Sequence, residues 1–212
     1  LMAQKNASDL FFSAGAPVSI KIDGITRHVG DSAMPAADIR AMADSIMNDR
    51  QKQEFENNLE MNLAFSLAEQ GRFRVNLYRQ RGEVSMAVRH ITSQIPSIEE
   101  LHLPVMLKDL VMAPRGLILV VGSSGSGKST TLAAMIDHRN QHQTGHILTI
   151  EDPIEYQHIH KQSVVDQREI GLDTLSYENA LKNAMREAPD VIMIGEIRDR
   201  ETMQAAIAYA QT

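Results

Sequence analysis

The first part of the chain contains apolar residues at two kinds of spacing. Residues 18–22 and 73–77 alternate apolar with polar positions, as strands with one solvent-facing side do. Asp23 and Gly24 follow the first of these strands and are typical of a hairpin turn. Residues 35–55 have helical spacing instead and predict one helix. We therefore expect a small domain that mixes strands with helices.

Beyond residue 95 the pattern changes to short runs that are apolar at every position. These runs are residues 117–121, 147–150 and 191–194, and helical spacing follows in 129–140, in 176–187 and from about 201. Strands that are apolar on both sides and alternate with helices indicate a parallel sheet covered on both faces. At the change itself, Ser97 follows a proline and predicts the cap of a short helix. We therefore place a domain boundary between residues 95 and 96.

Composition agrees with a folded protein of one or two domains. The chain has 212 residues, of which 43% are apolar and 23% charged, whereas disordered chains are poorer in apolar residues. It contains no cysteine, which excludes disulfides, cysteine-bound zinc and thiol catalysis. No apolar run approaches the roughly 20 residues that cross a bilayer, and no secretory leader is visible. Because the chain begins with Leu1, we expect a fragment or a trimmed form of a longer protein.

The formal net charge of −6 is unevenly distributed. Residues 1–95 carry 11 basic and 11 acidic side chains, whereas residues 96–212 carry 10 and 16. A protein that wraps nucleic acid needs a broad basic surface, so we expect no nucleic-acid partner. The first part does contain one local basic cluster. It consists of Arg72, Arg74, Arg79, Arg81 and Arg89.

A phosphate-binding loop follows the apolar run at residues 117–121. It reads Gly122-Ser123-Ser124-Gly125-Ser126-Gly127-Lys128-Ser129 and matches the P-loop pattern G-x-x-x-x-G-K-[ST] at every fixed position. Glycines let backbone N–H groups approach the phosphates, and the start of the next helix reinforces them. We expect Lys128 to contact the β- and γ-phosphates, Ser129 to hold Mg²⁺, and Thr130 to belong to the nucleotide site. The sequence therefore predicts ATP and Mg²⁺ as ligands.

Two acidic residues follow apolar runs, where a parallel sheet places its ligands. Glu151 comes after residues 147–150, and Glu196 comes after residues 191–194 and Gly195. A carboxylate at such a position can orient and deprotonate the water that attacks the γ-phosphate. The alternative for each residue is a helix cap or a solvated charge, and the spacing alone does not choose between them.

Four longer stretches resemble one family of motors. They are residues 71–75 (GRFRV), 150–155 (IEDPIE), 167–174 (QREIGLDT) and 188–198 (APDVIMIGEIR). Across essentially the whole chain, the sequence is similar to the retraction ATPases of type IV pili, PilT and PilU, which are secretion-type P-loop ATPases. The wording of the last stretch leans toward PilU. The resemblance implies an α/β fold, in which a small α+β PAS-like domain (1–95) precedes a RecA-like P-loop sheet (96–212).

This resemblance implies a cytoplasmic, hexameric ring that hydrolyses ATP with Mg²⁺ and drives pilus retraction in twitching motility. The ring would lie at the inner membrane through the pilus machinery, with a pilus platform protein and a partner retraction ATPase as contacts. Three alternatives remain: a PilU-like accessory module that modulates a partner motor ring, a related secretion or pilus-assembly ATPase, and a DNA-handling relative. The charge distribution argues against the last of these.

The resemblance also assigns roles to single residues. Glu151 becomes the catalytic glutamate, and Glu196 becomes the acidic residue near Mg²⁺, directly or through a water. Arg74 and Arg89 are expected to reach the nucleotide of the ring and stabilise charge on the γ-phosphate. For either arginine the alternative is a place on the solvated face of a strand. Relatives continue beyond Thr212 with a histidine box, a further strand and a helical domain, so we expect an incomplete core and leave open whether this chain alone hydrolyses ATP.

Overall fold

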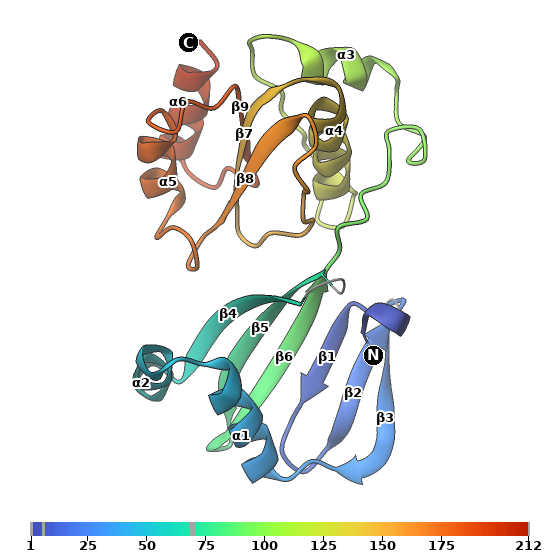
Figure 1. Cartoon of the computed structure of the whole chain (residues 1–212), viewed down its shortest axis with the longest axis vertical. Helices are drawn as coiled ribbons and strands as arrows, with labels where there is room; N and C mark the ends of the chain where they lie inside the picture. Colours follow the sequence, from blue (N-terminus) through green and yellow to red (C-terminus); the bar gives the residue numbers. More distant parts are fainter. Residues whose placement is uncertain (1, 6, 68–70, 212) are drawn as a thin grey trace. The chain divides into compact units, whose positions relative to one another are not determined.

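The computed structural model describes residues 2–5, 7–67 and 71–211 (Figure 1). The chain forms two compact units, Leu1–Ile91 and Thr92–Thr212, whereas the sequence predicted a boundary between residues 95 and 96. A short 3-10 helix, η1 (Ala3–Lys5), opens the first unit. In the part of the chain that the structure describes, no helix is long and apolar enough to cross a bilayer.

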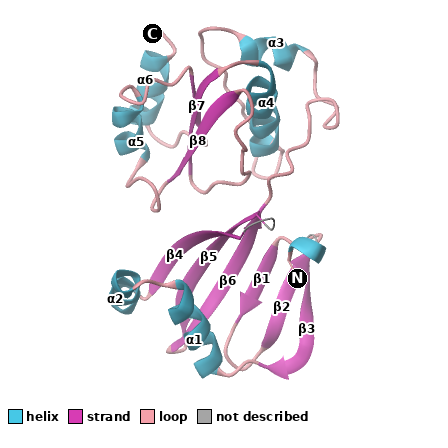
Figure 2. Cartoon of the chain, in the orientation of Figure 1, coloured by secondary structure: helices cyan, strands magenta, loops and turns pink. Residues whose placement is uncertain are grey.

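The first unit is built, within the described residues, on a six-stranded antiparallel sheet (Figure 2). Its strands are β1 (Asp9–Phe12), β2 (Pro17–Ile22), β3 (Ile25–Ala33), β4 (Glu60–Leu67), β5 (Gly71–Gln80) and β6 (Glu83–Ile91). Their order across the sheet is β3-β2-β1-β6-β5-β4. The predicted hairpin is confirmed, since Ile22 pairs with Ile25 and both Asp23 and Gly24 have positive φ.

Two helices pack on this sheet, where the sequence predicted one helix over residues 35–55. They are α1 (Ala36–Ile46) and α2 (Asp49–Asn58). The Asn48 side chain accepts a hydrogen bond from the backbone N–H of Gln51, and the Gln51 side chain accepts one from the backbone N–H of Asn48. Such a capping box starts a new helix, so the prediction of a single helix is wrong.

The core of the first unit lies between these helices and the sheet. Ile39 of α1 and Phe55 of α2 are fully buried. They belong to one apolar cluster with Val75 and Leu77 of β5, whose apolar residues share a face because side chains alternate along a strand. The alternation at residues 73–77 is thereby confirmed as the pattern of a strand with one buried face.

The second unit holds, over its described residues, a three-stranded parallel sheet in the order β8-β7-β9. The strands are β7 (Gly145–Glu151), β8 (Ser163–Glu169) and β9 (Val191–Ile194), and the helices are α3 (Met106–Met112), α4 (Lys128–His142), α5 (Tyr177–Ala184) and α6 (Arg200–Tyr209). Figure 1 shows α4 on one side of the sheet and α5 on the other. Ile147 of β7 clusters with Ile136 of α4, whereas the next residue, Leu148, clusters with Leu181 of α5. The predicted parallel sheet with helices on both faces is confirmed, as are the helices predicted over residues 129–140, over 176–187 and from about 201.

In the second unit, one predicted strand is wrong, and one observed strand was not predicted. Residues 117–121 form no strand, and Val121 is 89% exposed. An apolar run becomes a strand only where another strand supplies hydrogen bonds, and none of the strands in the described residues pairs with it. β8 was missed because Asp166, Gln167 and Arg168 interrupt its apolar residues.

The helix that the sequence predicted to begin at Ser97 is only a turn. The side chains of Ser97 and Glu100 each accept a hydrogen bond from the other residue's backbone N–H, as in a helix cap. His102 then has a φ of 53°, and Pro104 follows, so the chain leaves the helical conformation. The next helix, α3, begins at Met106.

Candidate functional site

The glycine-rich loop leads directly into α4. Gly127 is the N-terminal cap of that helix and has a φ of 90°, and Gly125 has a φ of 75°. Both values lie in the left-handed region that glycine adopts without strain. At Gly122, an added Cβ would lie only 2.6 Å from Ser126 Oγ. The Lys128 ammonium donates a hydrogen bond of 2.8 Å to the carbonyl oxygen of Ser123, so it folds back over the loop.

A pocket of about 410 Å³ opens beside this loop. It lies wholly within the second unit, between the start of α4 and the carboxyl ends of β7 and β9. Of the predicted nucleotide and catalytic residues, it is lined by Ser124, Gly125, Gly127, Lys128, Ser129, Thr130, Glu151 and Glu196. Gly122, Ser123 and Ser126 of the loop do not line it. The structure thus brings both candidate carboxylates to the phosphate-binding loop, as their positions after apolar strands predicted.

Glu151 is the last residue of β7 and is buried. Burial raises the pKa of its carboxyl group, because a charge is less stable away from water. Hydrogen bonds from Thr149 Oγ1 (2.7 Å) and Gln167 Nε2 (3.1 Å) to Glu151 Oε1 work against that rise. A raised pKa makes the ionised carboxylate a better proton acceptor.

Gly195 brings the end of β9 close to Glu151. Its backbone N–H donates to the carbonyl oxygen of Ile150 at 2.8 Å. A Cβ at this position would lie 3.3 Å from the Glu151 Cα, closer than most side chains tolerate. The absence of a side chain at Gly195 therefore leaves room for the candidate base.

Glu196 belongs to a group of charged side chains at the same end of the sheet. It forms an ion pair with Arg198, whose guanidinium also lies 3.8 Å from Asp152 Oδ2. The carboxylates that line the pocket are Glu151, Asp152, Glu155 and Glu196, and Ser129 adds a hydroxyl. Carboxylate and hydroxyl oxygens are ligands that Mg²⁺ prefers, so Ser129 and Glu196, the two residues predicted for this ion, fit it.

The pocket lining also includes residues that were not predicted, among them Tyr156, His158 and Met193. Tyr156 and Thr130 share a hydrogen bond of 3.0 Å between their hydroxyl groups, which connects the segment after β7 to the first turn of α4. Burial lowers the pKa of His158 to about 4, so this imidazole is neutral at pH 7. The signal for Tyr156 and His158 was their place just after Glu151, but only the folded loop turns them into the pocket.

The predicted arginines lie in the first unit, in strands other than those that form the pocket. Arg74 of β5 and Arg89 of β6 are paired across the sheet. Arg89 Nε donates to Asp9 Oδ1 at 2.8 Å, and its side chain is 60% exposed. The assignment of Arg74 and Arg89 to the nucleotide remains a prediction.

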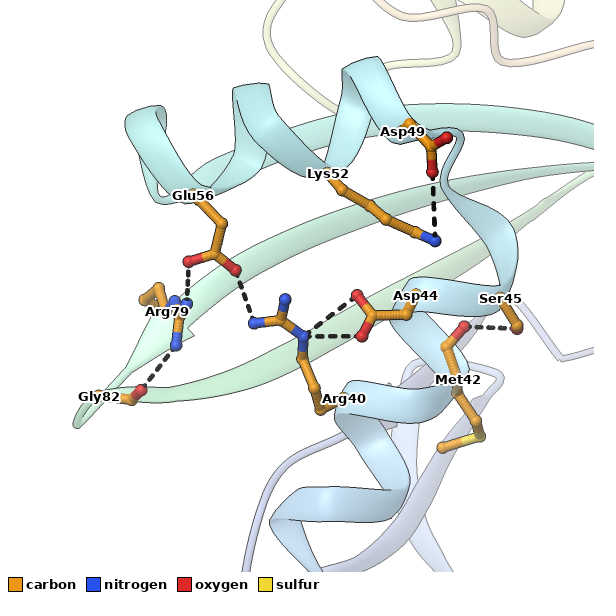
Figure 3. A network of polar contacts seen from close by, with 9 residues as sticks. All are labelled: Arg40, Met42, Asp44, Ser45, Asp49, Lys52, Glu56, Arg79 and Gly82. Atoms are coloured by element: carbon orange, nitrogen blue, oxygen red, sulfur yellow. Dashed lines mark hydrogen bonds and ion pairs between the residues drawn. The ribbon is translucent and has the colours of Figure 1, made fainter.

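Another arginine of the basic cluster has a structural role. Figure 3 shows the Arg79 guanidinium bonded to Glu56 of α2 at 2.7 Å and to the carbonyl oxygen of Gly82 at 3.0 Å. It also lies over the ring of Phe55, 5.6 Å from the ring centre. Arg40 of α1 reaches the other oxygen of Glu56 at 2.6 Å. Arg79 therefore connects α2 to β5, and Arg40 connects α1 to α2 through the same glutamate.

Comparison with known proteins places the chain in a family. A family model described as "Type II/IV secretion system protein" matches residues 2–212. The chain belongs to this family.

Among its relatives, the "Type IV pilus ATPase PilU" of Pseudomonas aeruginosa is 51% identical over 212 residues, which are 100% of this chain and 56% of that protein. The "Type IV pilus retractation ATPase PilT" of the same organism is 44% identical over 99% of this chain and 61% of that protein. The resemblance to the PilT and PilU ATPases is confirmed. The chain spans about three fifths of the length of these relatives.

Solved structures agree with this assignment of the fold. The crystal structure of "the Pilus Retraction Motor PilT and Bound ADP" has a TM-score of 0.91 at 44% identity, over 99% of this chain and 61% of that chain. The Legionella pneumophila ATPase DotB has a TM-score of 0.78 at 26% identity, over 98% of this chain and 60% of that one. The predicted α/β fold class, with a parallel ATPase sheet, is thereby confirmed.

Proposed function

We propose that this protein is a subunit of an ATP-hydrolysing motor that drives type IV pilus retraction. The observation that carries the proposal is one pocket in which the P-loop lysine and serine meet two carboxylates at the ends of parallel strands. The similarity to PilU and PilT, and the ADP in the related PilT structure, support ATP as the ligand.

In the proposed binding step, the phosphates of ATP lie at the N-terminus of α4. Backbone N–H groups there are not used by the helix and favour an anion. The Lys128 ammonium exchanges the carbonyl oxygen of Ser123 for phosphate oxygens, which carry a full negative charge. Thr130, tied to Tyr156, holds the first turn of α4 in place.

In the proposed hydrolytic step, Glu151 takes a proton from the attacking water. Its raised pKa suits a group that must accept a proton near neutral pH. Ser129 and Glu196 would hold Mg²⁺, which when bound neutralises charge on the phosphates. Arg74 and Arg89, supplied by a neighbouring subunit, would stabilise charge on the γ-phosphoryl group.

The proposed assembly is a hexameric ring in the cytoplasm, at the inner membrane through the pilus machinery. In such a ring, each interface would bring the arginines of one subunit's first unit to the phosphate pocket of its neighbour. The expected contacts are a pilus platform protein and a partner retraction ATPase.

The test is the substitution Lys128→Ala in the full-length protein. We expect nucleotide affinity or turnover to be lost, because the point charge on the β- and γ-phosphates is removed. ATP hydrolysis and binding of a fluorescent ATP analogue are measured together. The substitution Lys182→Ala, on the exposed face of α5, is the matched control. Turnover at the wild-type rate in Lys128→Ala would refute the assignment.

A second candidate is an accessory nucleotide-binding module that acts on a partner motor. The higher identity to PilU than to PilT favours it. The two functions differ in the turnover of the purified protein alone. No hydrolysis alone, combined with stimulation of a partner retraction ATPase, would support the module and contradict an independent motor.

A further inference from the structure

Thr149 and Glu151 lie on the same face of β7, because residues two apart in a strand point the same way. Thr149 is fully buried. A hydroxyl group in such a place is costly unless it forms a hydrogen bond. It donates that bond to Glu151 Oε1 at 2.7 Å. The hydroxyl therefore has a specific acceptor, which is the candidate base itself.

Gln167 reaches the same carboxylate from the neighbouring strand. It lies opposite Thr149 in the register of β7 and β8. Its Nε2 donates to Glu151 Oε1 at 3.1 Å and to the carbonyl oxygen of Tyr156 at 2.9 Å, and its Oε1 accepts from the backbone N–H of His158 at 2.7 Å. An amide that makes three such bonds has only one acceptable orientation, since a flip would reverse donor and acceptor.

The two donors share one oxygen of Glu151. Thr149 Oγ1 and Gln167 Nε2 both bond Oε1, so neither of them occupies Oε2. We propose that Thr149 and Gln167 are positioning residues that hold Glu151 by Oε1 and present Oε2 as the proton acceptor for the attacking water. The inference rests on the proposed function and adds to it the residues that orient the base.

The same bonds also oppose the effect of burial on the pKa of Glu151. Burial raises the pKa of Glu151, and the donated hydrogen bonds from Thr149 and Gln167, with a contribution from the backbone of Glu155, lower it. Removal of either side-chain donor therefore raises the pKa further. The activity of a base increases as it loses its proton, so the acidic limb of the pH–rate profile moves to higher pH in such a variant.

Other charged and titratable groups line the same pocket as Glu151 and also influence the pH–rate profile. The Glu155 carboxylate raises the pKa of Glu151. Lys128, Asp152, His158 and Glu196 also line the pocket. Thr149→Val removes none of these groups or their printed hydrogen bonds, so its profile reports on Glu151. Gln167→Leu also removes the bonds to the backbone of Tyr156 and His158, so its profile is interpreted together with that of Thr149→Val.

The experiment compares Thr149→Val and Gln167→Leu with the wild type in the full-length protein. Valine keeps the shape of threonine and removes only the hydroxyl. We expect kcat for ATP hydrolysis to fall at least about tenfold, KM to stay within about twofold, and the acidic limb to move to higher pH. Thr149→Ser, which restores the hydroxyl, should return most of the activity.

Thr202→Val is the matched control, because it removes another buried threonine hydroxyl that lies in α6. It should leave kcat and the pH profile unchanged. If kcat and the pH profile are unchanged in both Thr149→Val and Gln167→Leu, the inference is overturned. The proposed function is not affected by that result as long as the wild type hydrolyses ATP. A loss of kcat that Thr149→Ser does not restore, with an equal loss of ATP affinity, would also overturn it, since that outcome indicates a merely structural role.

A second readout does not require catalysis. The Glu151 carboxyl is titrated by ¹³C NMR in glutamate-labelled protein without nucleotide, and Glu151→Gln identifies its signal. An upward pKa shift of Glu151 in Thr149→Val and Gln167→Leu supports the two hydrogen bonds to its carboxylate, and an unchanged pKa refutes them. Absence of turnover in the wild type would count against the proposed function alone, and the titration would still decide the contacts.

Discussion

The two units of this protein use charged residues in different ways. In the first unit, Arg40, Glu56 and Arg79 form a surface network that ties helices to an antiparallel sheet (Figure 3). In the second, Glu151 and Glu196 follow parallel strands and line a pocket. Parallel strands bring all their carboxyl ends to one edge, whereas antiparallel strands alternate. The sheet type therefore decides where carboxylates gather into a site.

Two glutamates show what this difference means for proton chemistry. Glu56 is exposed, and the hydrogen bond from Arg40 is the largest cause of its lowered pKa. Glu151 is buried, and the loss of solvation raises its pKa. The ion pair favours the charged form of the first carboxylate, whereas burial favours the protonated form of the second. The following predictions test this contrast, from the largest expected effect to the smallest.

The largest effect is expected from Glu151→Gln. Glutamine keeps the size of the side chain and removes the base, so turnover should fall by about 10²–10⁴-fold while ATP still binds. Single-turnover hydrolysis and equilibrium ATP binding measure the two quantities. Glu178→Gln, which changes an exposed glutamate paired with Lys182 on α5, should have wild-type kinetics. Equal kinetics for Glu151→Gln and the wild type would refute the proposal that Glu151 is the catalytic base.

The arginines of the first unit provide the next test. Arg74→Ala and Arg89→Ala should each lower turnover about 10²-fold or more if they stabilise the γ-phosphoryl group across a ring interface. Arg79→Ala should lower only the free energy of unfolding, by about 1 kcal/mol, because its partners lie in α2 and the hairpin after β5. ATPase assays and denaturant titrations distinguish the two effects. A larger loss of turnover in Arg79→Ala than in Arg74→Ala would invert this assignment.

The smallest effect concerns the break between α1 and α2. Asn48→Ala removes the side chain that caps α2 and should lower the free energy of unfolding of the first unit by about 1 kcal/mol. Asn48→Ser retains a capping oxygen and should lose less. Both variants should keep wild-type turnover. Equal stability of Asn48→Ala and the wild type would show that the capping box does not hold the two helices apart.

Much of the fold could be predicted because its signals are local. The hairpin at Asp23 and Gly24 and the helix after Lys128 are determined by residues that are neighbours in the chain. The break at Asn48 was also a local signal, and it was missed because the apolar spacing of residues 35–55 continues across it. The strand predicted over residues 117–121 was wrong for a different reason. An apolar run contains no information about which strand, if any, will pair with it.

The candidate site divides in the same way. The P-loop was predicted from its motif, and the place of Glu151 and Glu196 in the same pocket was predicted from their positions after apolar strands. The contact between Gln167 and Glu151 joins two strands 16 residues apart, and nothing in the local pattern indicated it. Polar residues within β8 looked like an interruption of a strand, although one of them bonds the candidate base.

The sequence by itself determined the phosphate loop, the strands that end in carboxylates and the family, because short motifs and apolar periodicity depend on neighbouring residues. Only the tertiary structure decided which side chains donate hydrogen bonds to Glu151, which arginine connects α2 to β5, and which further residues line the pocket. These features depend on burial and on hydrogen bonds between distant segments. Such contacts exist only after the strands have paired in their register.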